Sequence, residues 1–239
     1  MMHQFFYKET NSITRYIWEN TRKRQGIAHD PGIPKFFDLD KEKKEWIYIM
    51  RRCMQEVIPN IFLGPYSVAS RSKLQSLLDH GITHIICVRH TIEANFIKPN
   101  FPDNFKYLVL NIADTEMENI IQHFQKVKAF IDESLHLGGR VLIHGNAGIS
   151  RSAALVLAYI METYELSLER AYCVLLRRRF CINPNEGFLT QLREYEPLYQ
   201  ARKATQIQQS SDQCNKRTIS QMDIDMNDSE EDKIKSIKT

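Results

Sequence analysis

The stretch VLIHGNAGISRSA, residues 141–153, combines residue types that can hold a phosphate. The apolar run 141–143 is typical of a buried strand and residues 153–161 of a buried helix, so a tight turn must join them. Successive backbone N–H groups in such a turn can form an anion nest, and the positive end of the following helix adds to it. The planar guanidinium of Arg151 can grip two phosphate oxygens at once.

The side chains of this turn offer further donors, because Ser150 and Ser152 both carry hydroxyl groups. Glycine and serine also occur in ordinary strand-to-helix turns, but the spacing of His144, Gly148 and Arg151 favours the nest. We therefore predict a phosphate-binding site formed by His144, Gly145, Asn146, Ala147, Gly148, Ile149, Ser150, Arg151 and Ser152.

The segment HGNAGISRS resembles the signature loop of cysteine-dependent protein phosphatases, which reads His-Cys, two residues, Gly, two residues, Arg, then Ser or Thr. NIADTEMENI (111–120) is similar to the general-acid loop of dual-specificity phosphatases, and CINPNEGFLTQL (181–192) to their closing segment. Longer runs, GITHIICVRHTIEANFIKPNF, AYIMET and RRFCINPN, resemble a catalytically inactive member of that family. The resemblance covers most of the central part of the chain.

The resemblance implies a role for four residues. It puts Gly145 at the nucleophile position, Arg151 at the phosphate-gripping position, Asp114 at the general-acid position, and makes His144 the residue that orders the loop. In active relatives a cysteine thiolate attacks phosphorus and forms a phosphocysteine. Glycine has no side-chain atom that can attack, so the resemblance implies a pseudoenzyme with no functional catalytic residue. Since no leaving group would depart, we expect Asp114, beside Thr115, to help cap the next helix.

Other residues with reactive side chains have plainer interpretations. Cys87 lies in the middle of the apolar run HIICV, where a buried and inert thiol is expected, and the same holds for Cys173 and Cys181. No evident base would activate a serine of the loop as a nucleophile. The basic run 177–179 could bind a second anion, but we favour a basic helix end that complements the helix dipole.

The turn must be positioned by alternating strands and helices, which is typical of an α/β domain. Apolar runs predict a strand or hairpin at the sheet edge over 56–65 and fully buried strands at 83–88, 107–112 and 141–144. Helices are expected over 70–81, 115–136, 153–161, 167–179 and 185–200, the second of them starting with a capping box of Thr115 and Glu118. The predicted fold is a dual-specificity phosphatase-like domain with a central, mainly parallel sheet flanked by helices.

Composition bounds the organisation of the chain. Its 239 residues are 43% hydrophobic and 26% charged, enough for one globular domain with tails. We predict a loosely ordered or disordered leader over 1–45, the phosphatase-like domain over 46–202 and a disordered tail over 203–239, where apolar patterning fails.

Charge and cysteine content narrow the class of protein. A net charge of +3 does not argue for nucleic-acid or membrane partners, and the N-terminal stretch is too polar for a secretory signal. Five cysteines without a CxxC pair favour reduced thiols over a disulfide framework or a zinc site. We expect a protein of the cytoplasm and nucleus that needs no cofactor and no metal.

The main hypothesis is a pseudophosphatase that binds phosphorylated Ser, Thr or Tyr in proteins without hydrolysing them. The resemblance implies regulation of phosphoprotein signalling, by anchoring or by competition with active phosphatases, with mitogen-activated protein kinases and F-box ubiquitin-ligase adaptors as partners. Two alternatives stay open. One is a protein–protein scaffold that does not use the pocket, and the other is a weak residual phosphatase that uses water with Asp114 and Arg151.

Overall fold

The computed structural model describes residues 46–205. They fall into two compact units, the first ending at Glu196 and the second beginning at Pro197. The expected leader over 1–45 and all but the first residues of the expected tail lie outside the described residues. Within 46–205 no helix is long and apolar enough to cross a membrane, and no cluster of His, Cys, Asp and Glu could hold a metal ion.

Five strands form one sheet in the order β1-β2-β5-β3-β4. β1 and β2 pair antiparallel as a hairpin at one edge, whereas the other neighbours pair in parallel. The expected edge hairpin and mainly parallel sheet are therefore confirmed. The strands are β1 (Gln55–Ile58), β2 (Ile61–Pro65), β3 (Ile82–Arg89), β4 (Lys106–Asn111) and β5 (Arg140–Gly145).

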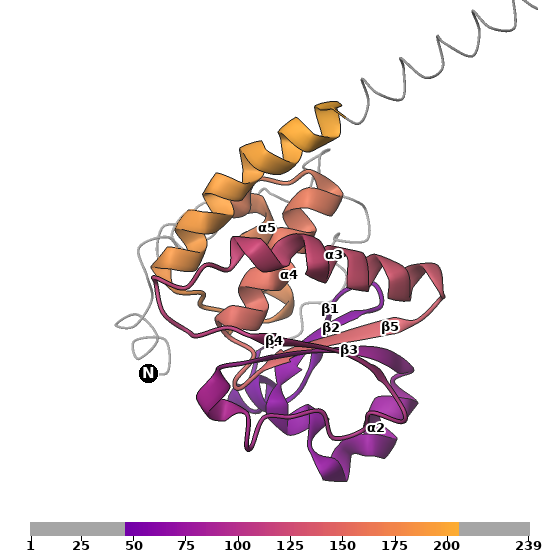
Figure 1. Cartoon of the computed structure of the whole chain (residues 1–239). Coiled ribbons are helices and arrows are strands. Elements are labelled where there is room, and N and C mark those ends of the chain that lie inside the picture. Colours follow the sequence, from indigo (N-terminus) through magenta and orange to yellow (C-terminus); the bar gives the residue numbers. More distant parts are fainter. Residues whose placement is uncertain (1–45, 206–239) are drawn as a thin grey trace, which may run out of the picture. The chain divides into compact units, whose positions relative to one another are not determined.

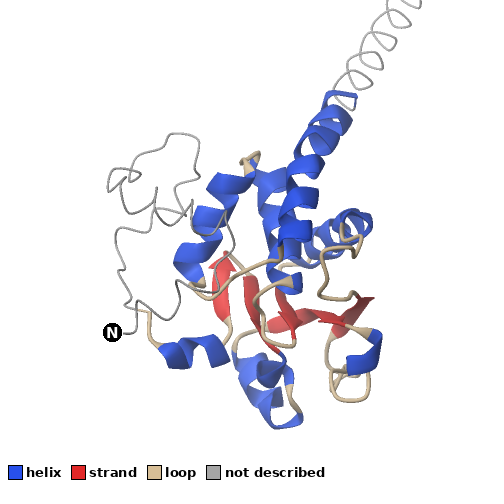
Figure 2. Cartoon of the chain, turned by 90° about the vertical axis from the view of Figure 1, so that its left-hand side faces the viewer, coloured by secondary structure: helices blue, strands red, loops and turns tan. Residues whose placement is uncertain are grey.

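Helices cover both faces of this sheet (Figures 1 and 2). One face carries α3 (Ile121–His136), α4 (Arg151–Tyr164) and α5 (Leu168–Arg178), and the other carries α2 (Leu74–Asp79). Residues 186–196 are helical and end the first unit, and the described part of the second unit, 197–205, is also helical. Short 3-10 helices are η6 (Tyr48–Arg52), η7 (Tyr66–Ala69), η8 (Arg71–Lys73) and η9 (Thr91–Glu93).

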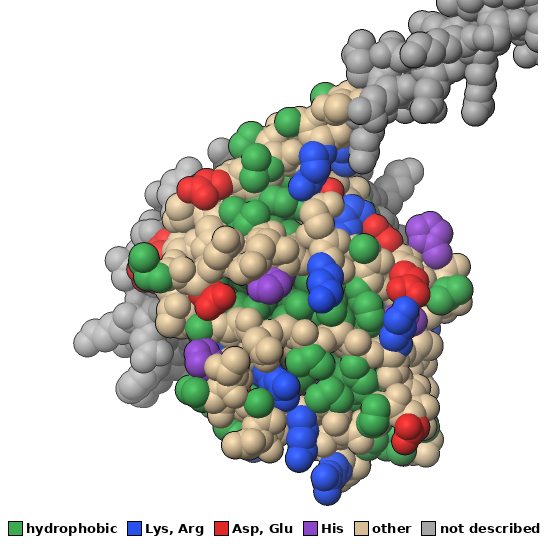
Figure 3. Space-filling view, viewed as in Figure 1, with side chains coloured by type: hydrophobic (Ala, Val, Ile, Leu, Met, Phe, Trp, Pro, Cys, Tyr) green, Lys and Arg blue, Asp and Glu red, His purple; other side chains and the backbone are tan. Residues whose placement is uncertain are grey.

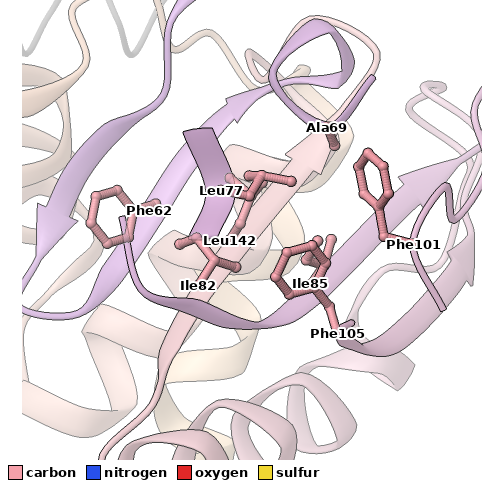
Figure 4. Close-up of a cluster of buried hydrophobic side chains, with 8 residues drawn as sticks. All are labelled: Phe62, Ala69, Leu77, Ile82, Ile85, Phe101, Phe105 and Leu142. Atoms are coloured by element: carbon pink, nitrogen blue, oxygen red, sulfur yellow. The ribbon is translucent and has the colours of Figure 1, made fainter. Parts of the chain in front are cut away.

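The core on the α2 face shows which way the strand residues point (Figure 4). Phe62, Leu142 and Ile85 lie in register on β2, β5 and β3, and all three belong to one buried cluster. Because side chains alternate along a strand, His144 points to the same face as Leu142. The position that a side chain of residue 145 would occupy then lies on the opposite face, where α4 lies.

Helix α4 is buried on every side, as the apolar run 153–161 predicts. A helix that is hydrophobic all round belongs inside a domain, and α4 packs between β5 and its neighbours α3 and α5. The outer surface is mixed instead. In Figure 3 basic and acidic side chains are both spread over the visible face, consistent with the small net charge.

Three expectations about local structure were wrong. The helix predicted from 115 begins at Ile121, and the side-chain Oε1 of Gln191 accepts hydrogen bonds from the N–H groups of Ile120 (2.8 Å) and Ile121 (3.3 Å). The expected capping box does not form, because the Glu118 carboxylate accepts from Ala113 N instead. Strand β4, expected to be fully buried, alternates between buried and partly exposed residues and is exposed at both ends, because it lies at the sheet edge.

Candidate phosphate-binding site

The predicted turn lies between the end of β5 at Gly145 and the start of α4 at Arg151. Gly148 adopts a φ of 68°, and a Cβ added there would come within 2.4 Å of the carbonyl oxygen of Gly64. Both the left-handed backbone and the close approach to β2 require glycine at this position. The turn is thus pressed against the sheet beside it.

The four carbonyl groups of residues 146–149 all accept hydrogen bonds from outside the turn. The outer two are held by backbone amides, and the inner two by one arginine side chain. The bonds are Tyr66 N to Asn146 O (3.1 Å), Arg179 Nη2 to Ala147 O (3.1 Å), Arg179 Nε to Gly148 O (2.8 Å) and Asn183 N to Ile149 O (2.9 Å).

These bonds determine where the amides of the turn point. In a planar trans peptide the C=O of one residue and the N–H of the next point in opposite directions. The N–H groups of residues 147–150 therefore point away from the four donor atoms that hold the carbonyls. None of these N–H groups donates to an acceptor within the described residues. Four successive free amides at the N-terminus of a buried helix form an anion nest.

Arg151 begins α4 and has a side chain that is 9% exposed. The end of its guanidinium donates to both carboxylate oxygens of Glu93, from Nη1 to Oε2 at 2.6 Å and from Nη2 to Oε1 at 3.2 Å. Nη1 also donates to the Ile112 carbonyl at 3.2 Å. Two of the five N–H groups remain, one on Nε and one on Nη2. They lie along one side of the planar guanidinium, where their spacing suits hydrogen bonds to two phosphate oxygens.

Asp114 lies beside that edge, with Oδ2 3.6 Å from Arg151 Nε. Its Oδ1 accepts from the Ser150 hydroxyl at 2.6 Å and from Asn185 Nδ2 at 3.0 Å. The expectation that Asp114 caps the next helix was wrong, because α3 begins only at Ile121. The carboxylate belongs to the site, and the Ser150 hydroxyl is committed to it.

Gly145 and Ser152 face each other across the start of α4. A Cβ added at Gly145 would lie 3.4 Å from Ser152 Oγ and 3.6 Å from the Val88 carbonyl oxygen, which are ordinary contacts. The Ser152 hydroxyl is buried and has no hydrogen-bond partner within residues 46–205. Since a buried hydroxyl normally has a partner, this donor is consistent with a ligand at the nest.

His144 lies behind the turn rather than in it. Its side chain is fully buried on the α2 face, and its ring centroid is 5.8 Å from that of Tyr66, whose N–H holds the first carbonyl of the turn. Burial lowers the pKa of His144 to about 4, so the imidazole is neutral at pH 7. The residue supports the turn by packing, and its buried side chain is not placed to contact a phosphate.

Cys87 and Cys181 are buried, as expected for inert thiols, whereas Cys173 is not fully buried. Cys87 is buried in β3, where desolvation raises the pKa of its thiol to about 11. Cys181 is buried with a raised pKa for the same reason, and Cys173 is partly buried. Each raised pKa keeps the thiol protonated at neutral pH, which disfavours nucleophilic attack.

Sequence reasoning missed two residues of the site. Glu93 lies 58 positions before Arg151, and no local pattern links the two. Arg179 was taken for part of a basic helix end, yet it is fully buried, whereas Arg177 is exposed. A signal was present, because Tyr172, Leu175 and Arg179 have the spacing of one buried helix face.

Comparisons with known proteins identify the family of the chain. The family model for the dual specificity phosphatase catalytic domain matches residues 61–197. The serine/threonine/tyrosine-interacting protein of Homo sapiens is 58% identical over 177 residues, covering 74% of this chain and 78% of the relative. Serine/threonine/tyrosine-interacting protein B of Xenopus laevis is 60% identical over 162 residues, covering 68% and 73%.

A solved structure supports the same relationship. The crystal structure of the human tyrosine phosphatase-like serine/threonine/tyrosine-interacting protein matches with a TM-score of 0.61 at 63% identity, covering 61% of this chain and 97% of that one. The family match spans strands β2 to β5, the turn and the helices on which the site is built. The chain therefore belongs to the dual-specificity phosphatase family.

Proposed function

We propose that this protein is a pseudophosphatase, which binds phosphorylated Ser, Thr or Tyr in other proteins and does not hydrolyse them. The observation that carries the proposal is the nest of four free amides directly before Arg151, whose Nε edge makes no hydrogen bond within the described residues, with glycine at residue 145. The nest and Arg151 can bind a phosphate group, but Gly145 has no side-chain atom to attack phosphorus.

The absence of a thiolate favours binding. A thiolate about 4 Å from a phosphate oxygen would repel it by on the order of 4 kcal/mol per charge pair at an intermediate dielectric. The nest does not need a side chain at residue 145 to keep its shape, because donors outside the turn hold its carbonyls.

The family resemblance supports the cellular role that we propose. The protein regulates phosphoprotein signalling by anchoring phosphoproteins or by competing with active phosphatases for them. Its proposed partners are mitogen-activated protein kinases and F-box ubiquitin-ligase adaptors, in the cytoplasm and nucleus. The similar relatives are named as interacting proteins, in keeping with a binding role.

A calorimetric titration with a phosphopeptide and its unphosphorylated form tests the binding. Arg151→Ala should weaken phosphopeptide binding by about 1.5–3 kcal/mol, the usual worth of a hydrogen bond to a charged group. The matched control is Arg177→Ala, which removes an exposed arginine outside the site. Equal affinity of wild type and Arg151→Ala would favour a scaffold that does not use the pocket. Phosphate release above buffer would favour a residual phosphatase.

A further inference from the structure

Arg179 is a fully buried arginine that follows the last residue of α5. All five of its N–H groups are used, three by segment 51–55 and two by the turn of the phosphate site. Its acceptors are Cys53 O (2.9 Å from Nη1), the Gln55 side-chain Oε1 (from Nη1), Arg51 O (3.2 Å from Nη2), Ala147 O (3.1 Å from Nη2) and Gly148 O (2.8 Å from Nε). No donor is left for a second anion.

The two bonds to the turn hold its centre. Asn146 O and Ile149 O, at its edges, accept from backbone amides that belong to the surrounding fold. Ala147 O and Gly148 O, at its centre, accept from the Arg179 side chain. The direction of the Gly148 and Ile149 amides, the middle two of the nest, thus depends on one guanidinium.

The packing around Gly148 also indicates that the turn depends on the Arg179 guanidinium. A Cβ added at Gly148 would lie 3.0 Å from Arg179 Nη2, so the absence of a side chain there lets the guanidinium approach the turn. A lysine at residue 179 could not replace it, because an ammonium group lacks the planar fork that reaches two successive carbonyls and segment 51–55 together.

We propose that Arg179 is a positioning residue of the phosphate site, which keeps the Gly148 and Ile149 amides pointed into the nest by holding the carbonyls behind them. The inference deepens the proposed function and rests on it. It also couples the site to segment 51–55, since the same guanidinium binds the carbonyls of Arg51 and Cys53.

A thiolate introduced into the chain at the nest tests this inference, because its pKa depends on the direction of the nearby amides. In the full-length Gly145→Cys variant the introduced thiolate lies at the nest, where such thiols have pKa values of about 3.5–7.5. The rate of alkylation at residue 145 is measured against pH, with the modified peptide identified by mass so that the native cysteines do not interfere. Adding Arg179→Lys should raise the pKa of this thiol by about one unit or more, because two amide dipoles turn away from it.

Arg177→Lys in the same Gly145→Cys background is the matched control and should leave the thiol pKa unchanged, since Arg177 is exposed. Gln55→Met, which removes one acceptor of Arg179 without substituting a residue of the turn, should loosen the guanidinium and raise the pKa by a smaller amount. Gln55→Met tests the positioning role of Arg179 if Arg179→Lys does not fold. An unchanged thiol pKa in folded Arg179→Lys, or in Gln55→Met where the former does not fold, would overturn the inference.

A parallel titration of the single variants with inorganic phosphate separates this inference from the proposed function. Wild type should bind phosphate and Arg179→Lys should bind it at least tenfold more weakly. If wild type bound neither phosphate nor phosphopeptide while the thiol pKa still depended on Arg179, the binding function would fail and the positioning role would stand.

Discussion

Glu93 holds the end of the Arg151 guanidinium with both carboxylate oxygens, at 2.6 Å and 3.2 Å. The two side chains are only 12% and 9% exposed. Burial by itself raises the pKa of Glu93, but the hydrogen bonds from Arg151 and from His90 N–H outweigh it, so the pKa lies below its usual range. The pair fixes the orientation of the Arg151 guanidinium and leaves its Nε edge beside Asp114.

The ion pair predicts a pH-dependent contribution to stability. A carboxylate with a lowered pKa in the folded state stabilises the protein above its unfolded pKa, about 4.3, and loses this effect as the pH falls through the folded value. Glu93→Gln should lower the free energy of unfolding at pH 7 by about 1–3 kcal/mol, since the charged hydrogen bonds are lost. The difference from wild type should shrink below about pH 4.

Urea unfolding at pH 7 and near pH 3.5 measures this difference. Glu194→Gln, at an exposed carboxylate, is the control and should change stability little at either pH. A Glu93→Gln difference that stayed constant with pH would show that the carboxylate charge does not contribute.

Substituting two glycines that share a left-handed backbone conformation distinguishes the cost of backbone strain from the cost of a steric clash. Gly148 and Gly138 have φ values of 68° and 70°, but an added Cβ would meet the Gly64 carbonyl at 2.4 Å in the first case and nothing within 4 Å in the second. Gly138→Ala should cost about 1–2 kcal/mol for the left-handed backbone. Gly148→Ala should cost several kcal/mol more, since backbone must move, and should abolish phosphate binding. Equal melting temperatures of the two variants would contradict this account.

Asp114 should oppose the binding of a phosphate dianion, because its carboxylate lies 3.6 Å from the Nε edge of Arg151. Asp114→Asn keeps an Oδ1 that can accept from Ser150 and Asn185 while the negative charge is removed. We expect phosphopeptide affinity to rise by about three- to tenfold at low salt, with a smaller gain at high salt, where screening weakens the repulsion. Calorimetric titration measures it, with Glu116→Gln, an exposed carboxylate two positions on, as the control. A weaker affinity in Asp114→Asn would mean that the carboxylate helps binding.

The sequence predicted the parts of this fold that depend on local patterns. Buried strands appear as apolar runs, and the turn between β5 and α4 as glycines before a buried helix, because burial and backbone freedom act on neighbouring residues. The start of α3 was placed too early because Thr115 and Glu118 have capping-box spacing. The actual cap, Gln191, lies 71 positions from Ile120, so only the folded chain brings them together.

In the candidate site, too, features that depend on local patterns were predicted and long-range contacts were not. The turn and Arg151 were predicted from the sequence, but the partners that orient them were not. Glu93 and Arg179 act through contacts 58 and 31 positions away in the chain, respectively with Arg151 and Gly148. Asp114 was assigned a local role because its neighbours suggested a helix start, whereas its contacts are with Ser150 and Asn185. Long-range hydrogen bonds leave no periodic trace in the sequence.

Restoring a thiol tests whether Gly145 is the sole reason for the proposed lack of catalysis. The backbone leaves room for a Cβ at residue 145, 3.4 Å from Ser152 Oγ, and the free amides of the nest would favour a thiolate there. We expect wild type to release no phosphate above buffer, and Gly145→Cys to hydrolyse an aryl phosphate and to form a phosphocysteine that mass spectrometry detects.

Second substitutions in the Gly145→Cys background assign the supporting roles. Asp114→Asn should slow the restored reaction by about 100-fold or more, with the largest effect on poor leaving groups, because Asp114 would protonate the departing oxygen. Arg151→Ala should nearly abolish it, since the phosphate would lose its bidentate partner, while Arg177→Ala serves as the matched control. A folded but inactive Gly145→Cys protein would show that Asp114, held by Ser150 and Asn185, is not placed for proton transfer, or that the nest does not bind phosphate. Phosphopeptide titration of the same variant distinguishes these two causes, because only the second removes binding.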